Sequence, residues 1–304
     1  MSLSESQIIE LIKAIFEPIL APGAKNLLND GAELPPVPKG HTRVVSLDAF
    51  QEHNDFKIGL GPLESAGHRA ITQNLSDLAA MGAKPVGFLW SLELPAAWLQ
   101  NSARYLRQFC EGALKVCQEN GLEFYGGDLS ASRDHFSCAI TIFGDVAGKP
   151  LGRQGAKPGD KIYVSEALGA SAAGLKNSSG EGLEIHLYPK AELQLGQKLL
   201  GVATACMDVS DGLAKDLSRL CKASNVGARI HTVPTHPEAT REQALYGGED
   251  YALLFTAPDS KFGIEIGEIT KAPEVLIKTS KGFQILEPGG YDHFSSFSAG
   301  HTPL

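Results

Sequence analysis

Two kinds of apolar pattern alternate along this chain, and their alternation limits the folds that it can adopt. Continuous apolar runs, such as residues 86–94, predict strands, whereas amphipathic runs, such as residues 98–119, predict helices. Both kinds occur on either side of the turn sequence Gly148-Lys149-Pro150. We therefore predict an α/β (or α+β) fold with two domains, residues 1–149 and residues 150–304.

The composition excludes several classes of protein. With 43% hydrophobic and 20% charged residues the chain is typical of a folded globular protein, and its net charge of −8 argues against a nucleic-acid binder. No apolar run approaches the ~20 residues that span a membrane, and the N-terminus lacks the pattern of a signal peptide. Five cysteines without a C-x-x-C pair predict neither a disulfide framework nor a zinc site. We expect a cytoplasmic protein without a membrane or nucleic-acid partner.

Several local elements bear on function. Ser4 and Gln7 form a capping-box pair that predicts a helix over residues 4–20. A strand over residues 42–47 is expected to deliver Asp48 at its end, and a strand over residues 122–125 to lead into Gly126-Gly127-Asp128. A helix is predicted over residues 213–222, directly after the segment Asp208-Val209-Ser210-Asp211-Gly212.

Carboxylates at the ends of predicted elements are the main chemical signal. A single aspartate in such a place is usually a turn former or a helix cap. Several converging carboxylates would repel one another unless cations neutralised them, and Mg²⁺ prefers such oxygen ligands together with phosphates. The sequence therefore predicts a site for several Mg²⁺ ions and a nucleotide. The residues concerned are Asp30, Asp48, Asp77, Asp128, Asp208, Asp211, Glu249 and Asp250.

The segment 208–212 is the sharpest of these signals. Asp208 and Ser210 are expected to project to one side, while Asp211 opens a helix whose first N–H groups are available to a phosphate. A plain helix cap is the simpler interpretation of this segment taken alone. No G-x-x-x-x-G-K-[ST] sequence occurs in the chain, which excludes a P-loop kinase.

Together these segments identify a resemblance to a known family. The chain resembles the thiamine-monophosphate kinase family, within the superfamily of aminoimidazole ribonucleotide synthetase. The matching segments follow the order of the family along nearly the whole chain. They are NLSDLAAMGAKP (74–85), YGGD (125–128), RQGAKPGDKIYVSEALGASAAGL (153–175), MDVSDGLAKDL (207–217), GGEDYALLFT (247–256) and GYDHF (290–294).

The resemblance implies an N-terminal domain that pairs with its copy to form a dimer barrel, and a C-terminal α/β domain. It implies that ATP and several Mg²⁺ ions bind between the domains and that thiamine monophosphate is the acceptor. The implied metal positions are Asp30, Leu47, Asp48, Asp77, Asp128, Asp208 and Asp211. The implied nucleotide contacts are Gly127, Asp128, Arg153 and Ser210, and the implied substrate contacts are Asp55, Glu249 and Pro288. No catalytic residue beyond the metal ligands is implied, because the attacking phosphate oxygen is already anionic.

Three of these positions depart from the pattern of the family. Leu47 replaces a threonine that binds metal, Asp55 replaces a histidine that contacts substrate, and Pro288 replaces an aromatic residue that stacks on the substrate. Two alternatives therefore stand beside a thiamine-monophosphate kinase. One is a related Mg²⁺–ATP-dependent kinase or synthetase with a different acceptor, and the other is a nucleotide-binding paralogue without catalysis.

Overall fold

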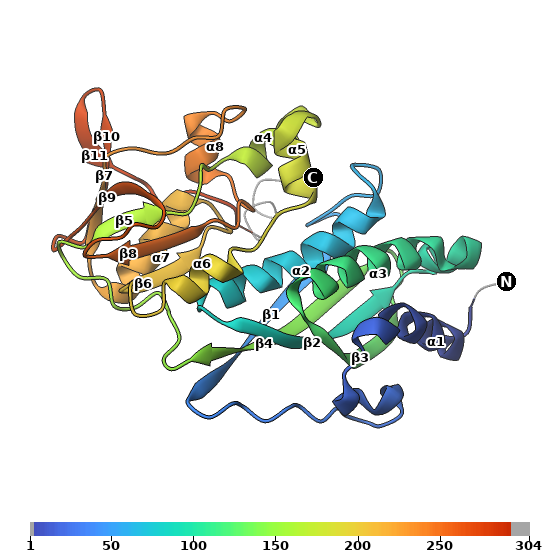
Figure 1. The fold of residues 1–304 in the computed structure, drawn as a ribbon. Helices are drawn as coiled ribbons and strands as arrows, with labels where there is room; N and C mark the ends of the chain where they lie inside the picture. The colour runs from blue at the N-terminus through green and yellow to red at the C-terminus, as the bar shows by residue number, and fades with distance from the viewer. Residues whose placement is uncertain (1–2, 293–304) are drawn as a thin grey trace. The chain divides into compact units, whose positions relative to one another are not determined.

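Two separate groups of contacts organise the chain in the computed structural model, which describes residues 3–292 (Figure 1). Within this range, unit 1 contains residues 3–78 and 84–145, and unit 2 contains residues 79–83 and 146–292. The short segment 79–83 belongs to unit 2 because it packs there. The backbone N–H of Leu151 donates to the carbonyl of Met81, and Gln197 donates to the carbonyl of Ala83.

Unit 1 is built around a four-stranded sheet in the order β1-β4-β2-β3. Helices α2 and α3 lie along one face of this sheet (Figure 1). Its α-helices are α1 (Glu5–Phe16), α2 (Leu63–Ala80) and α3 (Gln100–Asn120), and its short 3₁₀ turns are η1 (Glu17–Ile19), η2 (Pro22–Leu27) and η3 (Ala96–Leu99). Its strands are β1 (His41–Gln51), β2 (Lys84–Leu94), β3 (Glu123–Ala131) and β4 (Ser137–Ala147).

The first helix begins where the sequence predicts and ends earlier. Ser4 and Gln7 form the capping box, with the Ser4 N–H donating to the Gln7 side chain over 2.8 Å. The helix ends at Phe16 instead of continuing to residue 20, because Pro18 has no N–H to continue the hydrogen-bond ladder. The ring of Phe16 is fully buried against Phe124, with 4.8 Å between ring centroids.

Two strands are longer than the sequence predicts. Asp48 lies inside β1, which runs to Gln51, and not at the end of a strand. Likewise Gly126, Gly127 and Asp128 lie inside β3, where Gly127 pairs with Trp90 of β2. Hydrogen bonding to a neighbouring strand outweighs the low strand preference of glycine and aspartate at these positions.

Unit 2 is built around a seven-stranded sheet in the order β11-β10-β7-β9-β5-β8-β6. Its strands are β5 (Lys161–Val164), β6 (Ala205–Asp208), β7 (Gly227–Ile230), β8 (Leu253–Ala257), β9 (Ile264–Thr270), β10 (Val275–Thr279) and β11 (Gly282–Ile285). Its helices are α4 (Ala170–Asn177), α5 (Gly180–Leu187), α6 (Leu193–Lys198), α7 (Leu213–Ser224) and α8 (Arg241–Tyr246). Both sheets mix parallel and antiparallel pairs, which confirms the mixed α/β class.

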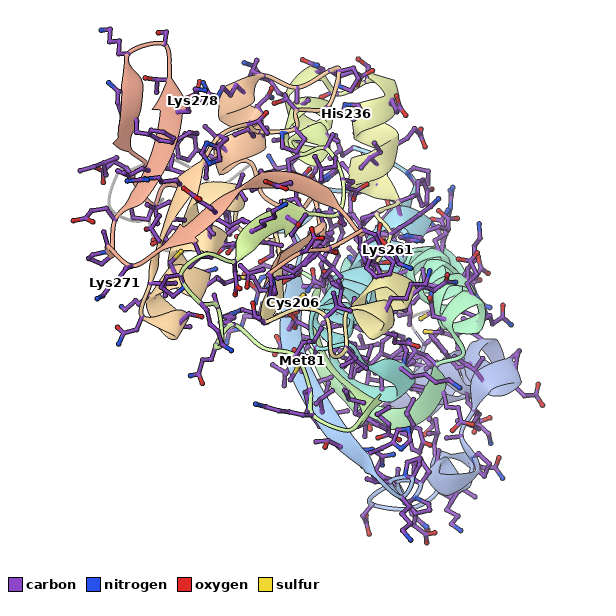
Figure 2. The ribbon with its side chains drawn as sticks, turned by 60° about the vertical axis from the view of Figure 1, so that its left-hand side comes forward. Met81, Cys206, His236, Lys261, Lys271 and Lys278 are labelled. Atoms are coloured by element: carbon purple, nitrogen blue, oxygen red, sulfur yellow. The ribbon has the colours of Figure 1, made fainter. Side chains whose placement is uncertain are left out.

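The cysteines all lie within the described residues, and each is buried with a free thiol. Cys206 belongs to the core of unit 2, whereas Lys271 and Lys278 extend from its outside (Figure 2). Burial raises the pKa of each of these thiols, which fits a packing role and not a nucleophilic one. In the described part of the chain, no helix is both long enough and apolar enough to cross a membrane.

Candidate active site

Two carboxylates of unit 1, those of Asp48 and Asp77, lie side by side between β1 and α2. Their side chains are hydrogen-bonded to each other, and the hydroxyl of Ser46 donates a short hydrogen bond to Asp77. The pKa of Asp48 is raised to about 7, first by burial and then by the negative charges of Asp77 and Asp55. A carboxyl in this environment is partly protonated at neutral pH, and a bound cation would displace the proton.

This pair suits a divalent metal by the chemistry of its donors. Carboxylate and hydroxyl oxygens are the ligands that Mg²⁺ prefers, and a bound cation would relieve the repulsion that raises the pKa of Asp48. Among residues 3–292, however, no three acidic, histidine or cysteine side chains gather as a ready-made metal site. Phosphate oxygens or water would therefore have to complete the coordination of an ion held by this pair.

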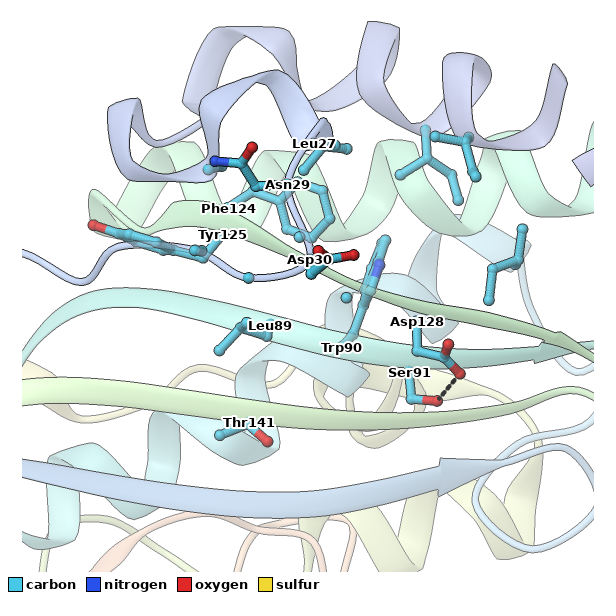
Figure 3. Close-up of a pocket in the computed structure, with 18 of the residues that line it drawn as sticks. Leu27, Asn29, Asp30, Leu89, Trp90, Ser91, Phe124, Tyr125, Asp128 and Thr141 are labelled. Carbon is cyan, nitrogen blue, oxygen red and sulfur yellow. Dashed lines mark hydrogen bonds between the residues drawn. The ribbon is translucent and has the colours of Figure 1, made fainter. Parts of the chain in front are cut away.

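A pocket of about 620 Å³ opens elsewhere in unit 1, above β2 and β3 (Figure 3). Trp90, Phe124 and Tyr125 lie at its base, while Asp30 and Asp128 bring carboxylates to it. The hydroxyl of Ser91 donates to Asp128 over 3.4 Å. Volume and lining both suit a small ligand with an aromatic part and a charged part.

Gly127 also lines this pocket. Position 127 requires glycine because no larger residue fits there. A Cβ atom at this position would lie 1.8 Å from the carbonyl oxygen of Trp90. The glycine therefore keeps β3 close to β2 and leaves its backbone open toward the pocket.

The predicted metal positions of unit 1 form two groups. Successive residues of a strand point to opposite faces, so Leu47 and Asp48 of β1 diverge. Leu47 lines the pocket with Asp30 and Asp128, whereas Asp48 contacts Asp77. The leucine side chain has no ligand atom, so it contributes only apolar surface to the pocket.

Asp55 closes the turn after β1, close to Asp48. Its carboxylate accepts a hydrogen bond of 2.7 Å from the N–H of Gln51, and its carbonyl accepts one of 2.7 Å from buried Arg69. This position therefore shapes the loop after β1, and its charge contributes to the raised pKa of Asp48.

The second set of predicted ligands lies in unit 2, between β6 and α7. Asp208 is the last residue of β6 and is almost fully buried. Asp211 follows in the connecting loop, and Ser210 accepts a hydrogen bond of 2.8 Å on its carbonyl from the N–H of Glu249. The MDVSDG and GGED segments are thereby tied together.

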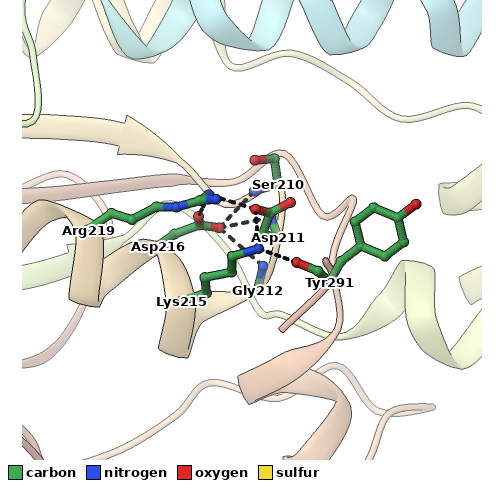
Figure 4. A network of polar contacts seen from close by, with 7 residues as sticks. All are labelled: Ser210, Asp211, Gly212, Lys215, Asp216, Arg219 and Tyr291. Carbon is green, nitrogen blue, oxygen red and sulfur yellow. Dashed lines mark hydrogen bonds and ion pairs between the residues drawn. The ribbon is translucent and has the colours of Figure 1, made fainter. Parts of the chain in front are cut away.

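Asp216 holds this loop in place from inside α7 (Figure 4). One of its oxygens accepts hydrogen bonds from the backbone N–H groups of Ser210, Asp211 and Gly212, at 3.1, 2.9 and 3.1 Å. A fully buried carboxylate of α7 thus occupies these three donors. These three donors belong to the loop that precedes α7, which begins at Leu213, so the prediction that the first N–H groups of the helix bind a phosphate stays a prediction.

Asp211 is paired with two basic residues of α7. Lys215 and Arg219 approach the same carboxylate oxygen, at 3.0 and 2.7 Å. Arg219 also donates to the second oxygen of Asp216 over 2.9 Å. Lys215 reaches the carbonyl of Tyr291 as well, and the N–H of Tyr291 donates to the carbonyl of Asp211 over 3.0 Å.

Glu249 adopts an unusual backbone conformation beside this loop. Its φ angle is +61°, a region that non-glycine residues rarely adopt, and its carboxylate lies 3.4 Å from Nδ1 of buried His186. The same ring nitrogen lies 2.9 Å from the hydroxyl of Ser171. These contacts fix the direction of the Glu249 side chain, which remains partly exposed.

The remaining predicted contacts of unit 2 lie at its surface. The side chain of Arg153 is exposed, while its carbonyl accepts a hydrogen bond of 2.9 Å from Ser224. Pro288 is exposed too, and the neighbouring Gly289 packs against the ring of Tyr246. His293 and Phe294 of the GYDHF segment lie outside the described residues.

Sequence reasoning missed four residues that shape these sites: Ser46, Asp216, Lys215 and Arg219. An acidic residue in the first turn of a predicted helix is a recognised signal and points to Asp216. The spacing of Asp211, Lys215 and Arg219 by four residues also predicts contacts along one helix face. For Ser46 we find no local signal, because its partner lies 31 residues away.

Comparison with known proteins identifies the family of this chain. The family described as AIR synthase related protein, N-terminal domain, matches residues 29–146, and its C-terminal domain matches residues 157–262. The thiamine-monophosphate kinase of Escherichia coli (strain K12) is 33% identical, over 88% of this chain and 92% of that protein. The chain belongs to the thiamine-monophosphate kinase family.

Solved structures of family members share the fold of this chain. The thiamine-monophosphate kinase from Stenotrophomonas maltophilia K279a is 29% identical with a TM-score of 0.76, over 91% of this chain and 97% of that one. A structure described as AaThiL complexed with AMPPCP and TMP is also 29% identical with a TM-score of 0.76. It covers 97% of this chain and 99% of that one.

The environment of Asp48 predicts how stability depends on pH. Its pKa in the folded protein, about 7, exceeds the ordinary value of 3.8, so ionisation destabilises the metal-free fold as pH rises between these values. Asp48→Asn removes this cost. Its free energy of unfolding in EDTA should exceed that of the wild type by on the order of 2 kcal/mol above pH 7, with the difference shrinking toward pH 4.

Urea unfolding at several pH values measures this difference. Asp134→Asn, at an exposed position, is the matched control and should follow the wild type throughout. If the free energy of unfolding of Asp48→Asn also changes with pH as that of the wild type does, the pKa of Asp48 is not raised as described above.

Proposed function

We propose that this chain transfers the terminal phosphoryl group of ATP to thiamine monophosphate, which gives thiamine diphosphate. The observation that carries this proposal is the likeness to a family structure complexed with AMPPCP and TMP over 97% of the chain. The curated relatives with the same activity in their names span nearly its whole length as well. The retained aspartates at the matching positions support the same conclusion.

The proposed reaction asks little of the protein beyond electrostatics. The attacking oxygen belongs to a phosphate that is ionised at neutral pH, so no general base is required. Two polyanions must instead be held close together, and bound Mg²⁺ lowers the repulsion between them. Asp48 and Asp77 in unit 1, and Asp208 and Asp211 in unit 2, are the residues that we expect to hold metal.

The pocket of unit 1 is our candidate for part of the nucleotide site. Its apolar surface comes mainly from side chains such as Leu47, because Trp90, Phe124 and Tyr125 at its base are almost fully buried. Asp30 and Asp128 at the same pocket add oxygen ligands for a metal that accompanies the phosphates. Gly127 leaves room for close approach of the ligand to the backbone.

An activity assay with a matched pair of variants tests the proposed function. The purified chain is incubated with MgCl₂, ATP and thiamine monophosphate, and thiamine diphosphate is measured by its oxidised fluorescence after separation. We expect many turnovers for the wild type and for Asp134→Asn, which changes an exposed carboxylate. Asp208→Asn should lose at least about 100-fold in kcat, because a metal ligand is removed.

Melting temperatures of the variants distinguish a lost ligand from a lost fold. Absence of thiamine diphosphate, with binding of ATP retained, would reject the acceptor and favour the alternatives of another acceptor or a non-catalytic paralogue. An unchanged kcat for a folded Asp208→Asn would reject the role of that residue.

We also propose that unit 1 pairs with the same unit of a second copy of the chain. The face of its sheet that includes Val45 and Leu47 exposes apolar side chains, with exposed fractions of 59% and 63%. A flat apolar sheet face of this kind is stabilised when a second sheet covers it.

Sedimentation equilibrium tests the pairing. The wild type should behave as a dimer at micromolar concentrations, and Val45→Asp should shift it to monomers because a charge would be buried at the interface. Ile285→Asp, at a similarly exposed position in unit 2, should leave the dimer intact. A monomeric wild type would contradict the proposal.

A further inference from the structure

Four charged side chains before and on α7 form a network whose formal charges cancel (Figure 4). Asp211 and Asp216 contribute two negative charges, and Lys215 and Arg219 contribute two positive ones. Each carboxylate contacts at least one of the two cations within 3.0 Å. A neutral set of this kind attracts a free cation only weakly.

The two carboxylates of the network are held in different ways. Asp216 is fully buried, and three backbone N–H groups as well as Arg219 bind it, so it is fixed as part of the loop. Asp211 is partly exposed, and both cations approach the same one of its oxygens. Lys215 and Arg219 have long, partly exposed side chains that can turn to solvent without unfolding the loop.

We propose that Lys215 and Arg219 are internal counter-cations that compete with Mg²⁺ for the carboxylate of Asp211. This inference rests on the proposed function, in which Asp211 holds metal. A divalent ion at the oxygen that these cations approach would meet two positive charges within about 4 Å, a repulsion that must be relieved by their departure. The phosphates of a nucleotide supply negative charge that Lys215 and Arg219 can bind after they leave Asp211.

Asp211 therefore accepts metal together with a nucleotide more readily than metal alone. The pair of Asp48 and Asp77 differs from Asp211 in this respect. Burial and other carboxylates shift the pKa of Asp48, and no cation is among the causes. Lys215 adds a link to the C-terminal segment, because the same ammonium group donates to the carbonyl of Tyr291. When Lys215 leaves Asp211, that contact is released with it.

Magnesium titrations of the full chain test the competition. MgCl₂ is added at constant ionic strength, alone and with saturating AMPPCP, and the melting temperature is followed to find the midpoint in free Mg²⁺. Lys215→Met and Arg219→Gln should each lower the midpoint without AMPPCP about threefold to tenfold, and should lower it less with AMPPCP, whose phosphates already draw these cations away from Asp211. Lys222→Gln, which removes one charge from an exposed position of the same helix, should leave both midpoints unchanged.

A double-mutant cycle and a metal-free measurement separate competition from a merely structural role. In EDTA, Lys215→Met should melt at a lower temperature than Lys222→Gln, and this gap should narrow at saturating MgCl₂. In an Asp211→Asn background, Lys215→Met should no longer change the midpoint. A structural role would instead lower the melting temperature equally with and without metal and leave the midpoint in place.

Two outcomes overturn the inference, and they are distinguishable. If the wild type responds to MgCl₂ but both variants keep or raise its midpoint, the counter-cation role is wrong and the proposed function stands. If MgCl₂ has no effect on the wild type with or without AMPPCP, the metal requirement of the proposed function fails, and the inference fails with it.

Discussion

Repulsion between carboxylates is the constraint on which the rest of this structure depends. The chain brings Asp48 next to Asp77 and places Asp211 close to Asp216, although negative charges at such distances destabilise a fold. Each pair is balanced in its own way. Burial and repulsion raise the pKa of Asp48 to about 7, so that partial protonation relieves the repulsion in the first pair, whereas Lys215 and Arg219 neutralise the second.

These two ways of balancing the carboxylate charges have different consequences for metal binding. In our proposal a cation replaces the proton at the first pair, and no ion pair has to break for it to bind. A carboxylate that is already paired with lysine and arginine exchanges its partners only when those cations find other anions. We propose that a phosphate-rich ligand provides such anions, which would link metal binding at Asp211 to the binding of the nucleotide.

The framework around these charges is rigid where the chemistry needs it. Asp48 projects from a sheet strand and Asp77 from a long helix, and Asp216 fixes the loop of Asp211 through three backbone hydrogen bonds. The aromatic core of unit 1 includes Phe16 and Phe124. Such rigid elements hold charged groups in place at little entropic cost during binding, which suits a reaction that depends on electrostatics and positioning.

Local sequence signals predicted the elements better than the contacts between them. The capping box at Ser4 and the start of α7 at Leu213 both follow from neighbouring residues. The extension of β1 through Asp48 depends on a sheet partner that local patterns do not reveal. The same limit applies to the bond between Ser46 and Asp77, which joins residues far apart in the chain.

The hydrogen bonds from three loop N–H groups to Asp216 were not predicted from the sequence for a different reason. The acidic residue in the first turn was visible, but a helix start offers its N–H groups equally well to a phosphate or to a side chain. The donors that Asp216 binds precede α7, so the prediction for the first N–H groups of the helix itself stays a prediction. The divergence of Leu47 and Asp48 likewise follows from strand alternation once β1 is known to include both.

Anomalous diffraction from crystals grown with MnCl₂ and AMPPCP tests the central claim most directly, since manganese replaces magnesium at oxygen sites and is located independently of the protein atoms. The account predicts manganese peaks within coordination distance of Asp48 and Asp77, and of Asp208 and Asp211. The second pair should lose its peak when AMPPCP is omitted. Crystals with bound AMPPCP but no manganese at either pair would contradict the account.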